Sequence, residues 1–164
     1  MKSFVLVLAV GLLAAGCSTL NTHFAPNANL SRCPHIYVQQ SLNDNHGLDA
    51  LIVKELQARG IQAESGPLTL MPRDAKVYLT YQDQWDWDFK NYLIALSLNA
   101  RDATTDGLLA TVSYFRPTAF IKTPAFMVQT ALDGLLDPAA KSTVILPVAK
   151  ARGGQGADAD KDRD

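Results

Sequence analysis

The chain has 164 residues, with 15 Lys and Arg against 16 Asp and Glu, so its formal charge at neutral pH is −1. This near balance argues against a nucleic-acid-binding protein, which would show a basic excess or a basic stripe. The length allows one domain with a real hydrophobic core and is too short for two such domains.

The N-terminus has the parts of an export signal. Lys2 supplies a positive start, residues 4–15 are apolar and uncharged, and small residues precede Cys17. The apolar stretch is shorter than the about 20 residues that a membrane-spanning helix needs. Residues 1–16 are therefore predicted to be a signal peptide that is removed after export. Its removal takes away one charge, Lys2, and leaves 148 residues with a formal charge of −2.

The cleavage region reads LAAGCS over residues 13–18 and resembles the bacterial lipobox. The resemblance implies that the Cys17 thiol receives a diacylglycerol and that Cys17 becomes the mature N-terminus. Two or three acyl chains anchor a protein stably, whereas one chain binds a membrane only marginally. Ser18, where inner-membrane lipoproteins tend to have aspartate, implies the outer membrane with the domain on the periplasmic side. A soluble secreted protein and an uncleaved anchor are the alternatives.

Polar segments flank the predicted domain. Residues 17–34 are rich in Asn, Ser and Thr and show no hydrophobic period, so we expect a lipidated tether. Residues 149–164 combine glycines with charges of both signs, which is typical of a disordered tail. Between them, residues 35–148 are predicted to form a single globular domain.

The first half of this domain is predicted to contain a strand, a helix and a connection. Residues 35–41 favour a short strand, and residues 46–59 favour a helix that ends at Gly60. Residues 61–74 are expected to be irregular, with room for a brief strand. The candidate N-terminal caps of the helix are Asn43, Asp44 and Asn45. Its apolar face is expected to consist of Leu48, Leu51, Ile52 and Leu56.

Three alternating strands are predicted to follow within residues 76–116. From residue 77 to residue 89 every second residue is apolar except Asp83. Such a period of two is typical of a half-buried antiparallel strand. Residues 91–102 and 108–116 repeat the pattern, with a turn at residues 102–107, so we expect an antiparallel meander. The residues expected to point inward on these two strands are Tyr92, Ile94, Leu96, Leu98, Ala100, Leu108, Ala110, Val112 and Tyr114.

A second helix is predicted over residues 124–136, with Thr123 as cap and Pro124 in its first position. Its inner face is expected to consist of Val128, Ala131, Leu132 and Leu135. Residues 142–148 are apolar, but Pro147 restricts them to an edge strand or a docked extension. Together these elements predict an α+β fold. We expect a two-layer sandwich in which the meander and an N-terminal strand carry both helices on one face.

Asp83, Trp85 and Trp87 are the candidate binding residues. A carboxylate in an apolar row needs an internal hydrogen-bond partner or lies at the rim of the sheet. A catalytic acid with a raised pKa is the alternative reading of Asp83. The two tryptophans are expected to close one end of the core, because each has a large apolar area and one N–H group. If they are exposed, they offer a platform for a glycan or a peptide.

The sequence predicts no catalytic residue, metal ligand or cofactor. Asp86 and Asp88 lie on the strand face opposite Asp83, about 7 Å apart, so the three carboxylates do not converge on one ion. Cys33 and His35 point apart on an extended chain, which argues against a nucleophile with its base. If Cys17 carries lipid, Cys33 is left to be buried, reactive or paired between molecules.

The second half of the domain carries a family resemblance. Its pattern is a tyrosine, an aspartate two residues later, W-x-W-D, then Y-L and a strand that ends in aspartate before a turn. With the lipobox, residues 77–114 resemble a family of small proteobacterial outer-membrane lipoproteins without an established activity. The resemblance supports the envelope address and implies no mechanism. The matching positions are Tyr81, Asp83, Trp85, Trp87, Asp88, Tyr92, Leu93 and Asp102.

We therefore predict a lipid-anchored envelope lipoprotein that faces the periplasm and acts as a non-enzymatic interaction or assembly subunit. Its partners would be the membrane, through the N-terminal lipid, and a protein of the envelope. The alternative is a glycan- or peptide-binding module that uses the Trp85 and Trp87 end. A hydrolase built on Asp83 is the weakest hypothesis, because neither a nucleophile nor a base accompanies it.

Overall fold

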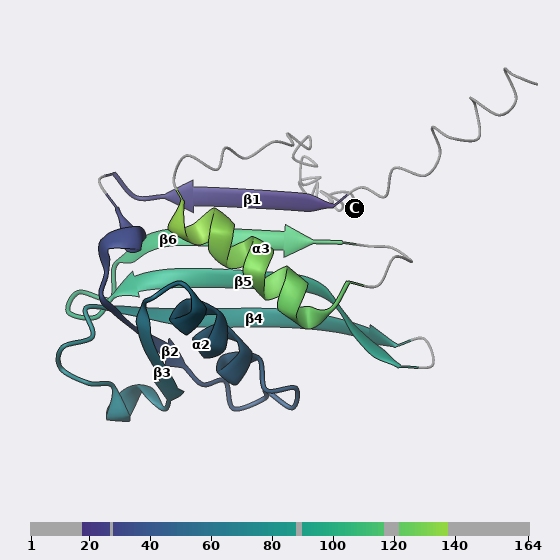
Figure 1. Cartoon of the computed structure of the whole chain (residues 1–164), viewed down its shortest axis with the longest axis horizontal. Helices are drawn as coiled ribbons and strands as arrows, with labels where there is room; N and C mark the ends of the chain where they lie inside the picture. Colours follow the sequence, from purple (N-terminus) through teal and green to yellow (C-terminus); the bar gives the residue numbers. More distant parts are fainter. Residues whose placement is uncertain (1–17, 27, 88–89, 117–121, 138–164) are drawn as a thin grey trace, which may run out of the picture.

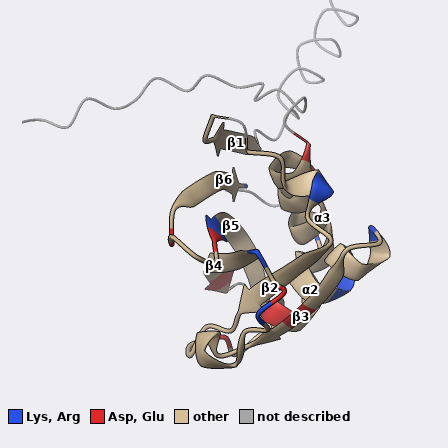
Figure 2. Cartoon of the chain, turned by 90° about the vertical axis from the view of Figure 1, so that its left-hand side faces the viewer, with Lys and Arg blue, Asp and Glu red and all other residues tan. Residues whose placement is uncertain are grey.

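A computed structural model describes residues 18–26, 28–87, 90–116 and 122–137. It contains a six-stranded sheet in the order β1-β6-β5-β4-β2-β3 (Figure 1). Seen edge-on, α2 and α3 lie on the same side of this sheet (Figure 2). The predicted α+β two-layer sandwich is confirmed. The elements are β1 (Thr19–Phe24), η2 (Leu30–Arg32), β2 (His35–Gln39), α2 (Leu48–Ala58), β3 (Gln62–Gly66), η3 (Leu68–Leu70), β4 (Val77–Trp87), β5 (Asn91–Asp102), β6 (Leu108–Phe115) and α3 (Pro124–Leu136).

Several predicted segments lie outside the described residues. They are the signal peptide with Cys17, the segment 142–148 and the tail 149–164. Among the residues that the structure describes, no helix combines the length and the apolar character needed to cross a membrane.

The prediction of a tether over residues 17–34 is wrong. Residues Thr19–Phe24 form β1, which pairs antiparallel with β6 from Thr19 opposite Phe115 to Phe24 opposite Ala110. Leu20 and Phe24 pack against the core. Alternate residues of this short segment contact the protein, and its backbone pairs with the outer edge of β6, so an otherwise polar composition still forms a strand.

The end of the predicted tether is also part of the domain. Leu30 in η2 is fully buried. The core therefore begins at β1, and the domain boundary predicted at residue 35 is too late.

The predicted meander is confirmed as β4, β5 and β6, but two irregularities change which side chains face inward. Gln84 pairs with Ala95 and Trp85 pairs with Leu93, so Ile94 is an extra residue on β5. Such a bulge reverses the faces of the residues beyond it. Leu93 is therefore the buried residue here, whereas the sequence predicted that Tyr92 and Ile94 point inward.

A second irregularity lies at the other end of β5. Ala100 pairs with Ala110 and Arg101 pairs with Leu108, which leaves Leu109 as the extra residue on β6. Leu109 packs against the core, while Leu108, predicted to point inward, is 43% exposed. The inward positions confirmed for the two strands are Leu96, Leu98, Ala100, Ala110, Val112 and Tyr114.

The connection between α2 and β4 contains the brief strand that the sequence allowed. This strand, β3, runs parallel to β2, and β2 in turn runs parallel to β4. Parallel neighbours need a long crossover connection, and α2 supplies it between β2 and β3. The sheet is therefore mixed, with β1 and β3 as its two edges.

Both helices pack on the sheet by the faces that the sequence predicted. In α2, Leu48, Ile52 and Leu56 are buried, while Leu51 is only partly buried. Gly60 follows α2 with φ of 77°, a left-handed conformation that glycine adopts without strain. The predicted inner residues of α3, namely Val128, Ala131, Leu132 and Leu135, are fully buried. Thr123 caps α3, because its Oγ1 accepts a hydrogen bond from the amide of Phe126 at 3.3 Å.

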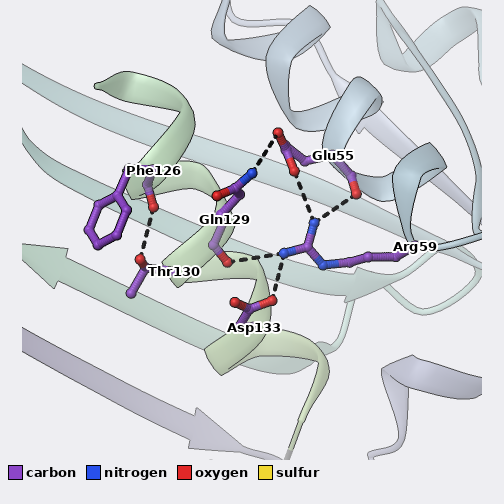
Figure 3. Close-up of polar contacts among 6 residues, drawn as sticks. All are labelled: Glu55, Arg59, Phe126, Gln129, Thr130 and Asp133. Carbon is purple, nitrogen blue, oxygen red and sulfur yellow. Dashed lines mark hydrogen bonds and ion pairs between the residues drawn. The ribbon is translucent and has the colours of Figure 1, made fainter. Parts of the chain in front are cut away.

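Arg59 joins the two helices (Figure 3). Its guanidinium donates to the Glu55 carboxylate of α2 at 3.2 Å and to the Asp133 carboxylate of α3 at 2.6 Å. Gln129 of α3 also donates to Glu55 at 3.2 Å. The buried Glu55 is thus held by partners from both helices, which fixes α2 against α3 over the sheet.

Candidate functional site

The polar cluster around Tyr81 lies where β4 meets the loop between β2 and α2. The Tyr81 hydroxyl donates to Asp44 Oδ2 at 2.7 Å and accepts from the Ser41 amide at 3.2 Å. Asp44 also accepts hydrogen bonds from the amide of His46 at 2.8 Å and from the amide of Asp49, in the first turn of α2, at 3.1 Å. Asp44, one of the three predicted caps, therefore bonds the start of α2, and Tyr81 fixes Asp44 to the sheet.

The ionisation of this pair suits a structural contact. Burial opposes the charged form of Asp44, but the hydrogen bond from Tyr81 and those from backbone amides outweigh it and hold the pKa of this carboxyl below its usual value. Burial and the hydrogen bond to Asp44 raise the pKa of Tyr81 far above that of a free phenol. Tyr81 is thus a neutral donor and Asp44 an anionic acceptor at neutral pH, and neither exchanges protons there.

Asp83 and Trp85 bond to each other on β4. The indole Nε1 of Trp85 donates to Asp83 Oδ2 at 2.6 Å. The indole also stacks on the His46 ring, with centroids 3.8 Å apart and an angle of 14° between the planes. Asp83 was expected to have an internal hydrogen-bond partner or to lie at the rim of the sheet, and it is half-buried. Its predicted internal partner is present and is Trp85.

The structure separates the two tryptophans. Trp85 is half-buried and packs against the core, whereas Trp87, the last residue of β4, is 68% exposed. The expectation that both close the core therefore holds for Trp85 alone. Asp86, between them, is exposed, and Asp88 is outside the described residues.

The other positions of the family-like pattern also serve the architecture of the hairpin. Leu93 is buried beneath the bulge. Asp102 accepts hydrogen bonds from the amides of Thr104 at 2.9 Å and Thr105 at 2.8 Å, which closes the turn into β6. These amides, with that of Thr105 contributing most, hold the pKa of Asp102 below its usual value. The pattern thus combines residues that shape β4, β5 and their turns.

Cys33 and His35 do not form a catalytic pair. The Cys33 thiol makes a long contact of 3.9 Å with the carbonyl of Asn29, and burial raises its pKa, which disfavours the reactive thiolate. His35 Nδ1 lies 2.7 Å from Asp74 Oδ2. Its Nε2 lies 3.2 Å from Glu64 Oε1, although without hydrogen-bond geometry. Both ring nitrogens therefore lie near carboxylates.

Two open depressions lie near residues already described, one beside Arg59 and the other beside Tyr81. One, of about 420 Å³, includes Arg59 and Asp133, whose charges already pair with each other. The other, of about 280 Å³, lies beside Tyr81 and is lined by uncharged polar groups and one leucine, namely Gln39, Gln40, Ser41, Leu42, Asn43, Thr80 and Tyr81. Such a lining can hydrogen-bond a neutral polar ligand, and none of these side chains is charged at neutral pH.

Within the described ranges, no group of three or more His, Cys, Asp or Glu side chains is arranged to hold a metal ion. Asp83 and Asp86, which the sequence placed on opposite faces of β4, have different partners. Asp83 accepts from Trp85, and Asp86 accepts from the backbone amide of Trp87 at 2.8 Å. The residues that sequence reasoning missed are His46, which contacts Trp85, and Tyr81, whose role as the partner of Asp44 no spacing in the sequence indicated.

Comparison with known proteins identifies the fold. No protein-family model matches the sequence, and no curated protein sequence is similar to it. The PelC dodecamer from Paraburkholderia phytofirmans matches with a TM-score of 0.56 and 12% identity, over 73% of this chain and 99% of that chain. A variant PelC dodecamer from the same organism matches with a TM-score of 0.57 and 12% identity, over 73% and 98% of the two chains.

A weaker likeness connects the chain to a minor lipoprotein from Acinetobacter baumannii. The TM-score is 0.31 and the identity 11%, over 60% of this chain and 84% of that chain. A similarity this weak does not indicate a shared fold or function. The chain thus shares its fold with nearly the whole length of PelC, while an identity of 12% says nothing about a shared activity.

Proposed function

We propose that this chain is an exported lipoprotein of the bacterial envelope. In this proposal the acyl chains on Cys17 hold it in the outer membrane, and its domain faces the periplasm as a non-enzymatic interaction or assembly subunit. Support for the anchor comes from the apolar leader and from the LAAGCS segment with Ser18.

The non-enzymatic role rests on one observation: the residues that most resemble a catalytic site are hydrogen-bonded to each other or to the backbone. Tyr81 and Asp44 bond to each other and to the start of α2, and Asp83 accepts from Trp85. These groups are thus already hydrogen-bonded within the protein: Tyr81 and Asp44 hold a loop to the sheet, and Asp83 is bonded within β4. Support for an assembly role comes from the PelC structures of the same fold, both of which are dodecamers.

The mass of the native particle tests the assembly role. The lipidated protein, extracted from membranes in mild detergent, should have a mass that corresponds to several copies or to a complex with another envelope protein. Cross-linking in intact cells before extraction should give the same composition. A monomer in detergent that also yields no cross-linked species would contradict the assembly role, without bearing on the anchor.

A second candidate is a glycan- or peptide-binding module, and the exposure of Trp87 favours it. Trp85 contributes little to such a platform, because its ring stacks on His46. The module predicts that Trp87→Ala loses capture of envelope glycan fragments or peptides while its melting temperature is unchanged. Equal capture by wild type and Trp87→Ala would contradict this candidate.

A further inference from the structure

We infer that one end of the domain, carrying Trp87, Phe115 and Phe126, is a docking face that rests in the headgroup layer of a lipid bilayer beside the acyl anchor. The inference rests on the proposed lipidation of Cys17, and it adds a second, non-covalent contact between the protein and the membrane. The three aromatic side chains are 68%, 41% and 37% exposed, respectively.

The strand directions bring the docking face together. Because β4, β5, β6 and β1 are successively antiparallel, the end of β4, the end of β6 and the start of β1 lie at one end of the sheet, and α3 also starts there (Figure 1). Trp87 ends β4, Phe115 ends β6 and Phe126 lies in the first turn of α3. Residues distant in sequence thus present aromatic rings at the same end.

The position of β1 places this end at the membrane. Thr19 begins β1 directly opposite Phe115, and only Ser18 separates Thr19 from Cys17. Two residues span at most about 7 Å. That is about the depth of the headgroup layer of one leaflet, roughly 5–8 Å. An acylated Cys17 would therefore hold Thr19 and the neighbouring Phe115 within that layer. A flexible tether of 18 residues would instead have allowed a separation of about 23 Å.

The β4–β5 hairpin extends further in the same direction. Gln84 lies in the same row across the sheet as Thr19, through Ala95 and Phe115. Trp87 lies three residues beyond Gln84, which is about 10 Å along a strand. The exposed indole is therefore the part of the docking face that projects furthest past the anchor point.

The chemistry of the docking face suits the boundary between water and lipid. Tryptophan concentrates there because its ring is apolar and its N–H is polar, and phenylalanine is common on the buried side of interfacial segments. The Lys122 ammonium lies 4.8 Å from the centre of the Phe126 ring, so an apolar group and a cation are presented together. The charged residues around this end have both signs, namely Asp83, Asp86, Lys90, Arg116 and Lys122. Docking should therefore depend on apolar contact and hardly on anionic lipid.

Fluorescence of Trp87 in vesicles tests this inference. The full lipidated protein carries Trp85→Phe, so that Trp87 is its sole tryptophan, and is reconstituted into phosphatidylcholine vesicles with brominated acyl chains, which quench tryptophans near the lipid. We expect a blue-shifted emission and a loss of about half of the intensity, as for a ring at the membrane interface. The converse variant, Trp87→Phe, should be quenched much less, because Trp85 is held between Asp83 and His46. The difference in quenching between wild type and Trp87→Phe also gives the quenching of Trp87, without altering Trp85.

Two exposed residues of β6 provide matched variants. Phe115 and Leu108 are 41% and 43% exposed and lie at opposite ends of the same strand. Phe115→Ser should reduce the quenching of Trp87 at least about twofold, since it removes an apolar contact at the interface, whereas Leu108→Ser should leave it unchanged. Raised salt should also change it little, because the charges around the docking face nearly cancel, with three cationic and two anionic side chains among the described residues.

The outcomes separate the docking face from the anchor. An acylated Cys17, shown by mass spectrometry, combined with an unquenched Trp87 overturns the docking face and leaves the proposed anchor standing. An unmodified Cys17 overturns both. A blue-shifted Trp87 that brominated lipid does not quench, in particles that cross-link as oligomers, means that a second copy covers this end, and it likewise overturns the inference.

Discussion

Trp85 stacks on His46, and this contact joins the outer part of β4 to the loop that precedes α2. The same indole donates to Asp83, so one side chain contacts both an aromatic ring and a carboxylate. Trp87, two residues later, is 68% exposed.

The two tryptophans should therefore differ in their effect on stability. Trp85→Ala removes a half-buried ring and with it the stacking contact on His46. We expect a loss of about 2 kcal/mol, below the 3–5 kcal/mol typical of fully buried aromatic residues. Trp87→Ala should change the free energy of unfolding by less than about 0.5 kcal/mol. Urea melts of both variants measure the difference. Similar losses for the two residues would contradict the separation that the structure shows.

The Tyr81 hydroxyl should stabilise the loop before α2. Tyr81→Phe removes the hydroxyl bond to the Asp44 carboxylate, which keeps only its backbone-amide donors, and we expect a loss of about 1–3 kcal/mol. Tyr114→Phe is the matched control, because Tyr114 is a buried tyrosine for which no hydroxyl hydrogen bond appears among the described residues. Equal melting of the two variants would show that the bond to Asp44 contributes nothing.

The hydrogen bond from Tyr81 to Asp44 should also affect how stability depends on pH. The pKa of Asp44 is lower in the folded protein than its ordinary value of 3.8. The contribution of Asp44 is therefore complete above that value and is lost as the pH falls through the lower folded pKa. In Tyr81→Phe the folded pKa rises towards the ordinary value, so the loss in acid should be smaller. Melts of wild type and variant between pH 5 and pH 2 compare the two slopes.

Sequence patterns predicted most of the fold because most of it follows local periods. The inner residues of α3, the Thr123 cap and Gly60 after α2 each depend on nearby sequence, and all are confirmed. The bulge at Ile94 could not be found in this way, because the register of two strands is set by their pairing and not by either strand alone. The same reason explains why Leu108 was wrongly predicted to point inward.

The candidate site was predicted only in part, for a related reason. Asp83 needed a partner, and Trp85 is near enough in sequence to be one. The contacts from Tyr81 to Asp44 and from Trp85 to His46 join residues nearly 40 positions apart, and only the folded sheet brings them together. β1 was missed because its burial depends on the free edge of β6, which the polar composition of residues 19–24 does not reveal.

The contacts by which Arg59 joins α2 to α3 give a further prediction. Arg59→Ala leaves the buried Glu55 without its cation, so we expect a loss of about 2 kcal/mol. Asp133 is 67% exposed and makes only one of the contacts of Arg59, so Asp133→Ala should cost less than about 1 kcal/mol. Thermal or denaturant melts would compare the two. A larger effect of Asp133→Ala would mean that the exposed pair with Asp133 contributes more to stability than the bond from Arg59 to the buried Glu55.

Gly134 tests whether β1 is docked beneath α3. A Cβ at this position would lie 3.2 Å from methyl groups of both Leu20 and Thr22. Gly134→Val should push β1 away and cost about 1–3 kcal/mol. Gly134→Ala should be milder, because alanine favours the helix by about 1 kcal/mol. Hydrogen exchange should quicken in residues 19–24 of Gly134→Val. Unchanged exchange there would show that α3 does not hold this strand.

The most direct test of the proposed function is the location of a variant that lacks the thiol of Cys17. The wild type should be recovered in the outer-membrane fraction, with a mature N-terminal peptide whose mass includes acyl chains. Cys17→Ser should appear as a soluble or unprocessed periplasmic form, since the anchor is covalent. If Cys17→Ser still fractionates with the outer membrane as the wild type does, the lipid-anchor account is contradicted.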